Sequence, residues 1–200
     1  MNRDSAALRF CLQGRVVACV LCFPRLRYSV SAGLLKLAQL GAQAHDWVLV
    51  HDAARCLVQP EWVQNLIQTC RHDPVGGLLA IPLPDTLKQA DQQRRVTATL
   101  SRDDKWLAQT PQMFRWQALS EALQHAGSTV TDEASAIESQ GLKPLLVQGS
   151  ALNFKVTYPD DLRLAAMVLA ARRMWPWKNM QLTTPFTLEK TGMAFGVSSI

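Results

Sequence analysis

Short apolar runs alternate along this chain with segments of helical periodicity, and this alternation constrains the fold more than any other feature. Runs rich in apolar and β-branched residues predict buried strands: Trp47-Val-Leu-Val50, Gly76 to Pro82, Leu145 to Val147 and Phe154 to Val156. Apolar residues at helical spacing and helix-start signals predict helices over 29–40, 60–71, 116–126, 132–140 and 157–173. Such alternation predicts a three-layer α/β fold with a mostly parallel sheet.

Capping residues indicate where several of these helices begin and end. Thr131 is expected to be an N-cap, and Thr157-Tyr-Pro-Asp160 has the pattern of a capping box with proline in the first turn. Gly127 and Gly141 stand where C-cap glycines end a helix. The boundaries of three helices are therefore expected close to these residues.

Residues 85–100 are polar, with β-forming residues near their end. This composition is typical of an extended arm or hairpin rather than of a core helix. The domain organisation that follows is a divergent N-terminal segment (1–28), a domain over 29–174 with its arm at about 86–100, and an unassigned tail (175–200).

Composition restricts the possible partners and the location of the protein. The net charge of +5 and the pI near 9.1 would suit nucleic acid. Lysine and arginine are spread along the chain, however, so no nucleic-acid partner is expected, and a small phosphorylated ligand explains the charge equally well. The longest apolar stretch, Val16 to Phe23, is too short to cross a bilayer. With no signal-peptide pattern either, we expect no membrane partner and a cytoplasmic location.

The five cysteines do not form the spacing of a metal site. Cys19-x-x-Cys22 is the only close pair, and no second pair lies nearby to complete a zinc site. Because both cysteines fall in an apolar run, we expect buried, reduced thiols.

Asp52 and Arg55 are the first candidates for chemistry because they directly follow the strand expected at Trp47–Val50. In open α/β sheets, ligands bind beyond the carboxyl ends of the strands. An aspartate there can hold a metal ion or a ribose hydroxyl, and an arginine three residues later can bind phosphate. The alternative is a capping aspartate followed by a surface arginine.

Two further residues stand at positions suited to ligand binding. Lys155 lies at the end of a predicted strand and just before a capped helix, so its ammonium and the helix N-terminus can converge on one anion. The alternative for this lysine is a solvent-facing side chain. Thr110 precedes Pro111, which requires an extended backbone and predicts a hydroxyl exposed in a loop.

Five motifs occur in a fixed order along the chain. They are Val48-Leu-Val-His-Asp-Ala-Ala-Arg55, Asp85-Thr-Leu-Lys88, Leu107-Ala-Gln-Thr-Pro-Gln112, Thr131-Asp-Glu-Ala-Ser135 and Lys155-Val-Thr-x-Pro-x-Asp-Leu162. Over about 29–170 the chain thereby resembles the 2-C-methyl-D-erythritol 4-phosphate cytidylyltransferase family. The Lys-Val-Thr and Thr-Pro-Gln elements are shared with other small nucleotidyltransferases, whereas His-Asp-Ala-Ala-Arg is the more diagnostic element.

The resemblance implies a Rossmann-like nucleotidyltransferase that forms a homodimer through extended arms. The implied reaction is attack of the 4-phosphate of methylerythritol phosphate on the α-phosphorus of CTP, with release of pyrophosphate. Catalysis of this kind rests on positioning and on charge neutralisation by Mg²⁺ and cationic side chains.

By the same resemblance, Asp52 contacts the ribose of the nucleotide and lies near the metal. Lys155 stabilises the transferring phosphate, and Arg102 is a second catalytic residue that reaches across the dimer. The residues implied to bind methylerythritol phosphate are Arg55, Thr86, Arg102 and Thr110.

The chain also departs from the family pattern. The family begins with a glycine-rich loop that holds the CTP phosphates, whereas Gly14 is the only glycine before Ser29 and no such loop occurs there. Cys56 replaces the proline that usually follows the Ala-Ala-Arg element. We therefore expect a coding sequence whose front part is lost or misread, and little or no cytidylyltransferase activity. The alternatives are a nucleotidyltransferase for another polyol phosphate and a non-catalytic remnant that only dimerises.

Overall fold

The structure is a computed structural model, and it describes residues 26–126 and 130–174. The apolar stretch Val16–Phe23, the pair Cys19 and Cys22, the helix stop at Gly127 and the tail after 174 lie outside the described residues. Within the described residues, no helix combines the length and the apolar character that a membrane crossing requires. The boundaries of the domain over 29–174 stay a prediction.

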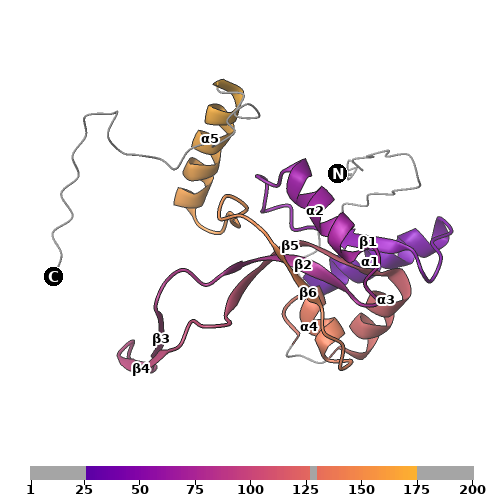
Figure 1. Ribbon diagram of the computed structural model, residues 1–200, viewed down its shortest axis with the longest axis horizontal. Coiled ribbons are helices and arrows are strands. Elements are labelled where there is room, and N and C mark those ends of the chain that lie inside the picture. Colours follow the sequence, from indigo (N-terminus) through magenta and orange to yellow (C-terminus); the bar gives the residue numbers. More distant parts are fainter. Residues whose placement is uncertain (1–25, 127–129, 175–200) are drawn as a thin grey trace, which may run out of the picture.

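The centre of the fold is a mixed sheet with the strand order β1-β5-β2-β6 (Figure 1). Its strands are β1 (Trp47–Val50), β5 (Trp106–Arg115), β2 (Gly76–Pro82) and β6 (Leu145–Gln148). Strand β5 is antiparallel to both β1 and β2, and β2 is parallel to β6. Three of the four strands therefore run in one direction, as expected of a mostly parallel sheet, and β5 runs against them.

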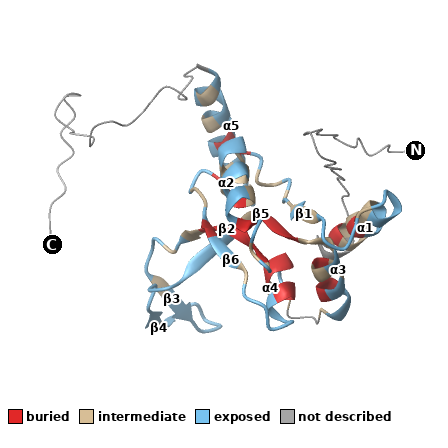
Figure 2. Cartoon of the chain, turned by 45° about the vertical axis from the view of Figure 1, so that its right-hand side comes forward, coloured by how far each residue is buried: buried red, intermediate tan, exposed pale blue. Residues whose placement is uncertain are grey.

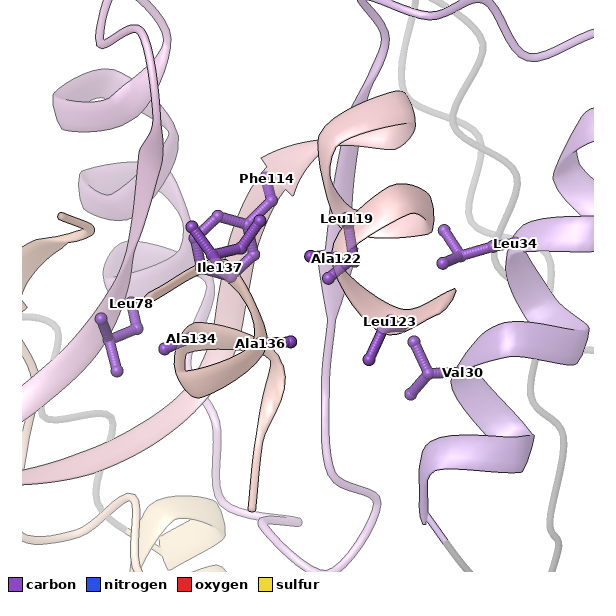
Figure 3. Close-up of a cluster of buried hydrophobic side chains, with 10 residues drawn as sticks. All are labelled: Val30, Leu34, Leu78, Phe114, Leu119, Ala122, Leu123, Ala134, Ala136 and Ile137. Atoms are coloured by element: carbon purple, nitrogen blue, oxygen red, sulfur yellow. The ribbon is translucent and has the colours of Figure 1, made fainter. Parts of the chain in front are cut away.

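Two layers of helices cover this sheet, which confirms the three-layer α/β fold. The helices of these layers are α1 (Leu26–Gln39), α3 (Trp116–His125) and α4 (Glu133–Glu138) on one face and α2 (Pro60–Cys70) on the other. A further helix, α5 (Pro159–Met174), projects away from the sheet (Figure 1). Neighbouring residues of a strand point to opposite faces. Phe114 accordingly packs with α1, α3 and α4 on one face, in the cluster drawn in Figure 3. Met113 packs on the other face with Leu66 and Cys70 of α2.

The strand β5 was not expected from the sequence, and it is central to the sheet. Pro111 lacks a backbone N–H, so a segment containing it does not look like a central strand. The register shows how the proline is accommodated: Leu78 pairs with Gln112 but Ala80 pairs with Ala108, which leaves Gln109, Thr110 and Pro111 opposite a single residue of β2. The extra residues form a bulge. Thr110 therefore lies within a strand, and its placement in a loop was wrong.

Three smaller expectations are also corrected. The N-cap of α4 is Asp132 rather than Thr131, because the Asp132 carboxylate accepts a hydrogen bond from the backbone N–H of Ser135. Residues 154–156 form an irregular loop and not a strand. Ahead of α5, the carboxylate that accepts from the N–H groups of Thr157 and Tyr158 belongs to Asp161, not Asp160.

Strand β1 is at the edge of the described sheet and is only half buried. The expectation of a buried strand was therefore wrong, since β1 pairs with β5 alone among the described strands. The arm, in contrast, is confirmed: β3 (Leu87–Ala90) and β4 (Val96–Leu100) form an antiparallel hairpin. The hairpin extends away from the sheet and is mostly exposed (Figures 1 and 2).

Candidate functional site

Four segments that are far apart in the sequence meet at one small pocket. They are the turn after β1, the bulge of β5, the start of α4 and the loop 149–157 that follows β6. The pocket has a volume of about 120 Å³. Its lining residues are Val50, Asp52, Arg55, Ala108, Gln109, Thr110, Gln112, Thr131, Asp132, Glu133 and Lys155. The turn after β1 and the loop after β6 both follow the carboxyl ends of their strands, where ligands bind in α/β sheets.

An ion pair between Asp52 and Lys155 joins two of these segments. The Lys155 ammonium lies 2.7 Å from Oδ2 of Asp52, and Oδ1 of Asp52 accepts a hydrogen bond of 3.0 Å from the Ala54 backbone N–H. Burial acts to raise the pKa of Asp52, but the bonds from Lys155 and Ala54 outweigh it and hold that pKa below its ordinary value. Asp52 is therefore ionised at neutral pH, and the Lys155 side chain is half exposed.

Arg55 connects the turn after β1 to strand β5 and to the loop 149–157. Its guanidinium donates from one terminal nitrogen to the Asn153 carbonyl at 2.7 Å and from the other to the Ala108 carbonyl at 3.1 Å. Its Nε is buried and has no hydrogen-bond partner among the described residues. The arginine lines the pocket while it also ties the backbone around it.

A short chain of hydrogen bonds fixes His51 and Thr110 behind Asp52. The Thr110 hydroxyl accepts from the Asp52 backbone N–H at 3.0 Å and lies 3.0 Å from Nδ1 of His51. Nε2 of His51 lies 3.2 Å from the Arg55 carbonyl, which can only accept. Burial lowers the pKa of His51, more than its bonds and the nearby Asp52 raise it. At neutral pH His51 is therefore neutral, Nε2 carries the proton, and Thr110 donates to Nδ1.

The opposite wall of the pocket is the start of α4. Gln112, almost fully buried on β5, donates to Asp132 at 2.9 Å and accepts from the Ala134 backbone N–H at 2.7 Å. Glu133 is only 3% exposed. Its burial, followed by the negative charges of Asp132 and Asp52, raises its pKa from the ordinary 4.5 to about 7.

This raised pKa predicts how stability depends on pH. Between pH 4.5 and 7 the folded protein keeps a proton on Glu133 that the unfolded chain releases, so stability falls as the pH rises through this window. A tenfold change in an ionisation equilibrium is worth about 1.4 kcal/mol. Glu133→Gln is therefore expected to raise the free energy of unfolding at pH 8 by about 3 kcal/mol, and by much less at pH 5.

Urea denaturation of wild type and variant at both pH values measures this effect. Glu138→Gln, at the exposed end of the same helix, is the matched control and should change stability little at either pH. An equal effect of Glu133→Gln at pH 5 and pH 8 would show that burial does not raise this pKa.

Four of the predicted site residues come together in the pocket: Asp52, Arg55, Thr110 and Lys155. Thr86 and Arg102 do not. They lie on the two sides of the hairpin base, where both are exposed, and Arg102 donates to the Pro84 carbonyl. Within one chain, neither residue lines the pocket.

Sequence reasoning missed the buried amides that hold the site, namely Gln109, Gln112 and Asn153. The two glutamines flank Thr110-Pro111. Polar residues around a proline predict a turn rather than a bulged strand. Asn153 precedes Lys155 by two residues in a loop, and nothing local distinguishes it from a surface asparagine.

The donor set of the site suits a metal that is shared with a substrate. Among the described residues there is no group of three or more His, Cys, Asp or Glu side chains that could hold a metal alone. Mg²⁺, however, is commonly bound by one or two carboxylates together with substrate phosphates. Asp52 is a carboxylate that is ionised at the pocket and meets this requirement.

A three-layer α/β fold that places a carboxylate, a guanidinium and an ammonium beyond its strand ends is the architecture of Rossmann-like nucleotidyltransferases. Comparison with known proteins defines the group within that class. The family model described as IspD, 2-C-methyl-D-erythritol 4-phosphate cytidylyltransferase, matches residues 17–171. The chain therefore belongs to the 2-C-methyl-D-erythritol 4-phosphate cytidylyltransferase family.

Individual relatives agree with this assignment. The chain is 63% identical over 144 residues to the bifunctional enzyme IspD/IspF of Albidiferax ferrireducens, covering 72% of this chain and 34% of that protein. It is 55% identical over 151 residues to the 2-C-methyl-D-erythritol 4-phosphate cytidylyltransferase of Cupriavidus pinatubonensis, covering 70% and 60%. The match thus spans little more than half of the second relative and about a third of the first.

Solved structures show the same fold. A crystal structure of 4-diphosphocytidyl-2C-methyl-D-erythritol synthase is 41% identical, with a TM-score of 0.69 and coverage of 74% of this chain and 68% of that one. The Francisella tularensis 2-C-methyl-D-erythritol 4-phosphate cytidylyltransferase is 36% identical, with a TM-score of 0.66 and coverage of 72% and 68%.

Proposed function

We propose that this site binds 2-C-methyl-D-erythritol 4-phosphate and serves cytidylyl transfer from CTP, in the synthesis of isoprenoid precursors. The observation that carries the proposal is the convergence of Asp52, Arg55, Thr110 and Lys155 on one pocket in a chain of this family. The products are 4-diphosphocytidyl-2-C-methyl-D-erythritol and pyrophosphate. A cytoplasmic location is part of the proposal.

In the proposed reaction, an oxygen of the 4-phosphate attacks the α-phosphorus of CTP, and the bond to the pyrophosphate leaving group breaks. The protein contributes chiefly by positioning the two phosphates and neutralising their charge. Lys155, half exposed at the pocket, provides the ammonium for the transferring phosphate. Arg55 and Thr110 line the same pocket and bind methylerythritol phosphate.

Mg²⁺ is the proposed cofactor, with Asp52 as its protein ligand. When bound, the ion would be held by this carboxylate and would neutralise negative charge on the phosphates. Asp52 is suited to both the ribose and the metal because its pKa lies below the ordinary value, so the carboxylate is charged at neutral pH.

The 200-residue chain on its own is expected to be a poor enzyme. Its sequence has no glycine-rich loop before Ser29, and this loop holds the CTP phosphates in the family. Removal of one preorganised donor commonly lowers the rate by about 100-fold to 1,000-fold. We therefore expect binding of methylerythritol phosphate, together with pyrophosphate release at least about 100-fold slower than that of a full-length family member.

Isothermal titration calorimetry with methylerythritol phosphate, with and without CTP and Mg²⁺, tests the binding. A coupled pyrophosphate assay, with the Cupriavidus pinatubonensis protein as positive control, tests the rate. Release as fast as in that control would refute the impairment but support the function. If neither ligand binds, the proposed function is wrong and the chain is a non-catalytic member of the family. Preferential binding of another polyol phosphate would reassign the substrate.

A homodimer formed through the β3–β4 hairpin is the second part of the proposal. The hairpin extends away from the sheet (Figure 2). It exposes Val96 and Leu100, which are 63% and 41% accessible. Thr86 and Arg102, at the hairpin base, would then serve the site of the partner subunit. Light scattering coupled to size exclusion should give a mass near twice 22.2 kDa. A protein that is monomeric at micromolar concentration would refute the proposed dimer and the proposed roles of Thr86 and Arg102.

A further inference from the structure

The loop 149–157 holds Lys155 in place although it has no regular secondary structure. Both ends of the loop are fixed by backbone hydrogen bonds to neighbouring segments. At the start, the Gly149 N–H donates to the Ala80 carbonyl at 2.8 Å, and at the end the Val156 N–H donates to the Ala54 carbonyl at 2.9 Å. These bonds leave open what fixes the middle of the loop.

The side chain of Asn153 fixes the middle of the loop. It is fully buried, and its Nδ2 donates to the Thr110 carbonyl at 2.9 Å and to Oε1 of Gln109 at 3.3 Å. The Thr110 carbonyl belongs to the bulge of β5. The backbone carbonyl of Asn153 accepts from Arg55 at 2.7 Å. One residue thus connects the loop to the bulge and to the turn that carries Asp52.

The side-chain hydrogen bonds of Asn153 are made by its NH₂ group and not by its carbonyl oxygen Oδ1. Its Oδ1 is buried and has no partner among the described residues, whereas its NH₂ group faces two acceptor oxygens. An aspartate of nearly the same shape would place a carboxylate against those acceptors. An aspartate at position 153 would therefore fit by size, but its charge and its lack of a donor would not suit the surrounding acceptors.

We propose that Asn153 is a positioning residue that sets the place of the Lys155 ammonium opposite Asp52. It acts through the loop backbone, since only Phe154 separates it from Lys155 in the chain and its own side chain does not line the pocket. The consequence for ligand affinity rests on the proposed function of the site. The consequence for the loop itself does not depend on that function.

NMR of the full chain tests the inference in Asn153→Ala and Asn153→Asp. The ¹⁵N signal of the Lys155 ammonium reports its ion pair, and Asp52→Asn gives the reference signal for a broken pair. We expect both Asn153 variants to shift the Lys155 signal toward that reference. They should also accelerate hydrogen exchange of the Val156 amide by about tenfold, as for the loss of one ordinary hydrogen bond. Amides of Leu79 and Phe114 in the core should stay protected.

The matched control is Gln148→Ala, an exposed residue at the end of β6 whose side chain donates only to the adjacent Gly149 carbonyl. It should leave the Lys155 signal and the Val156 exchange unchanged. An unchanged Lys155 signal in both Asn153 variants would overturn the inference. Loss of protection at Leu79 and Phe114 in both variants would also overturn it, because Asn153 would then support the whole core rather than position one lysine.

Calorimetry with methylerythritol phosphate distinguishes this inference from the proposed function. A wild type that binds, with affinity lowered in the Asn153 variants but not in Gln148→Ala, supports both. A wild type that binds nothing, while the Lys155 signal still responds to Asn153, overturns the proposed function and leaves the positioning role intact. A wild type that binds with unchanged affinity and an unchanged Lys155 signal in the variants overturns the positioning role alone.

Discussion

Lys155→Met is expected to weaken the binding of methylerythritol phosphate by about 10-fold to 100-fold. Hydrogen bonds to charged groups contribute about 1.5–3 kcal/mol, and each tenfold change in affinity corresponds to about 1.4 kcal/mol. Methionine keeps much of the apolar stem but removes the ammonium that pairs with Asp52 at 2.7 Å. The unpaired Asp52 carboxylate would then repel the phosphate as well, so the two effects act in the same direction.

Calorimetry at neutral pH measures this change, and a thermal melt shows whether the fold persists. Lys143→Met is the matched control, because Lys143 is exposed ahead of β6 and does not line the pocket. The control should bind as wild type does. Equal affinities in Lys155→Met and wild type would remove Lys155 from the site, even if the pocket itself binds the ligand.

Gly76→Ala is expected to destabilise the fold by about 4 kcal/mol, among the largest effects that a single substitution produces. Gly76 opens β2 with φ +106°, a conformation that residues with a Cβ rarely adopt. An added Cβ would also meet the backbone oxygen of Met113 on the neighbouring β5. Relief of that contact requires separating the two central strands, because backbone atoms cannot move aside as a flexible side chain can.

Urea denaturation followed by circular dichroism measures this loss of stability. Gly33→Ala is the control with the opposite expected sign. Gly33 lies inside α1, and nothing lies within 4 Å of a Cβ built there. Alanine in an open helical position stabilises by up to about 1 kcal/mol relative to glycine. A Gly76→Ala variant as stable as wild type would mean that β2 and β5 do not pair in the observed register.

The sequence predicts the structure most accurately where the interactions are local. Strand β1 and helix α2 have the predicted boundaries to within one residue, and the hairpin lies in the polar segment expected to form an arm. Helix α3 begins at Trp116 as predicted. In each case the signal is a short pattern of apolar spacing or of helix-start residues, which depends only on neighbours in the chain.

Predictions from the sequence were wrong where contacts with a distant segment determine the local structure. Strand β5 was not predicted because it contains Pro111. The bulge that accommodates this proline is recognised only from the pairing of β5 with Leu78 and Ala80 of β2. Residues 154–156 have the composition of a strand, but the loop that contains them is bonded to Ala54 and Thr110 instead. Threonine is a common N-cap residue, which is why Thr131 was predicted to cap α4. Asp132 is the N-cap instead, and its carboxylate also accepts a hydrogen bond from Gln112 of β5.

The sequence by itself showed which charged residues follow the predicted strands. It thereby indicated the family and the charged groups of the pocket. Those features follow from apolar periodicity and from motifs a few residues long. Only the tertiary structure decided which groups hold the site together, since Arg55 and Asn153 bond across 98 positions of sequence. The physical reason is that a buried amide or guanidinium is satisfied by whatever carbonyl the sheet order brings beside it, and sheet order is a property of the assembled fold.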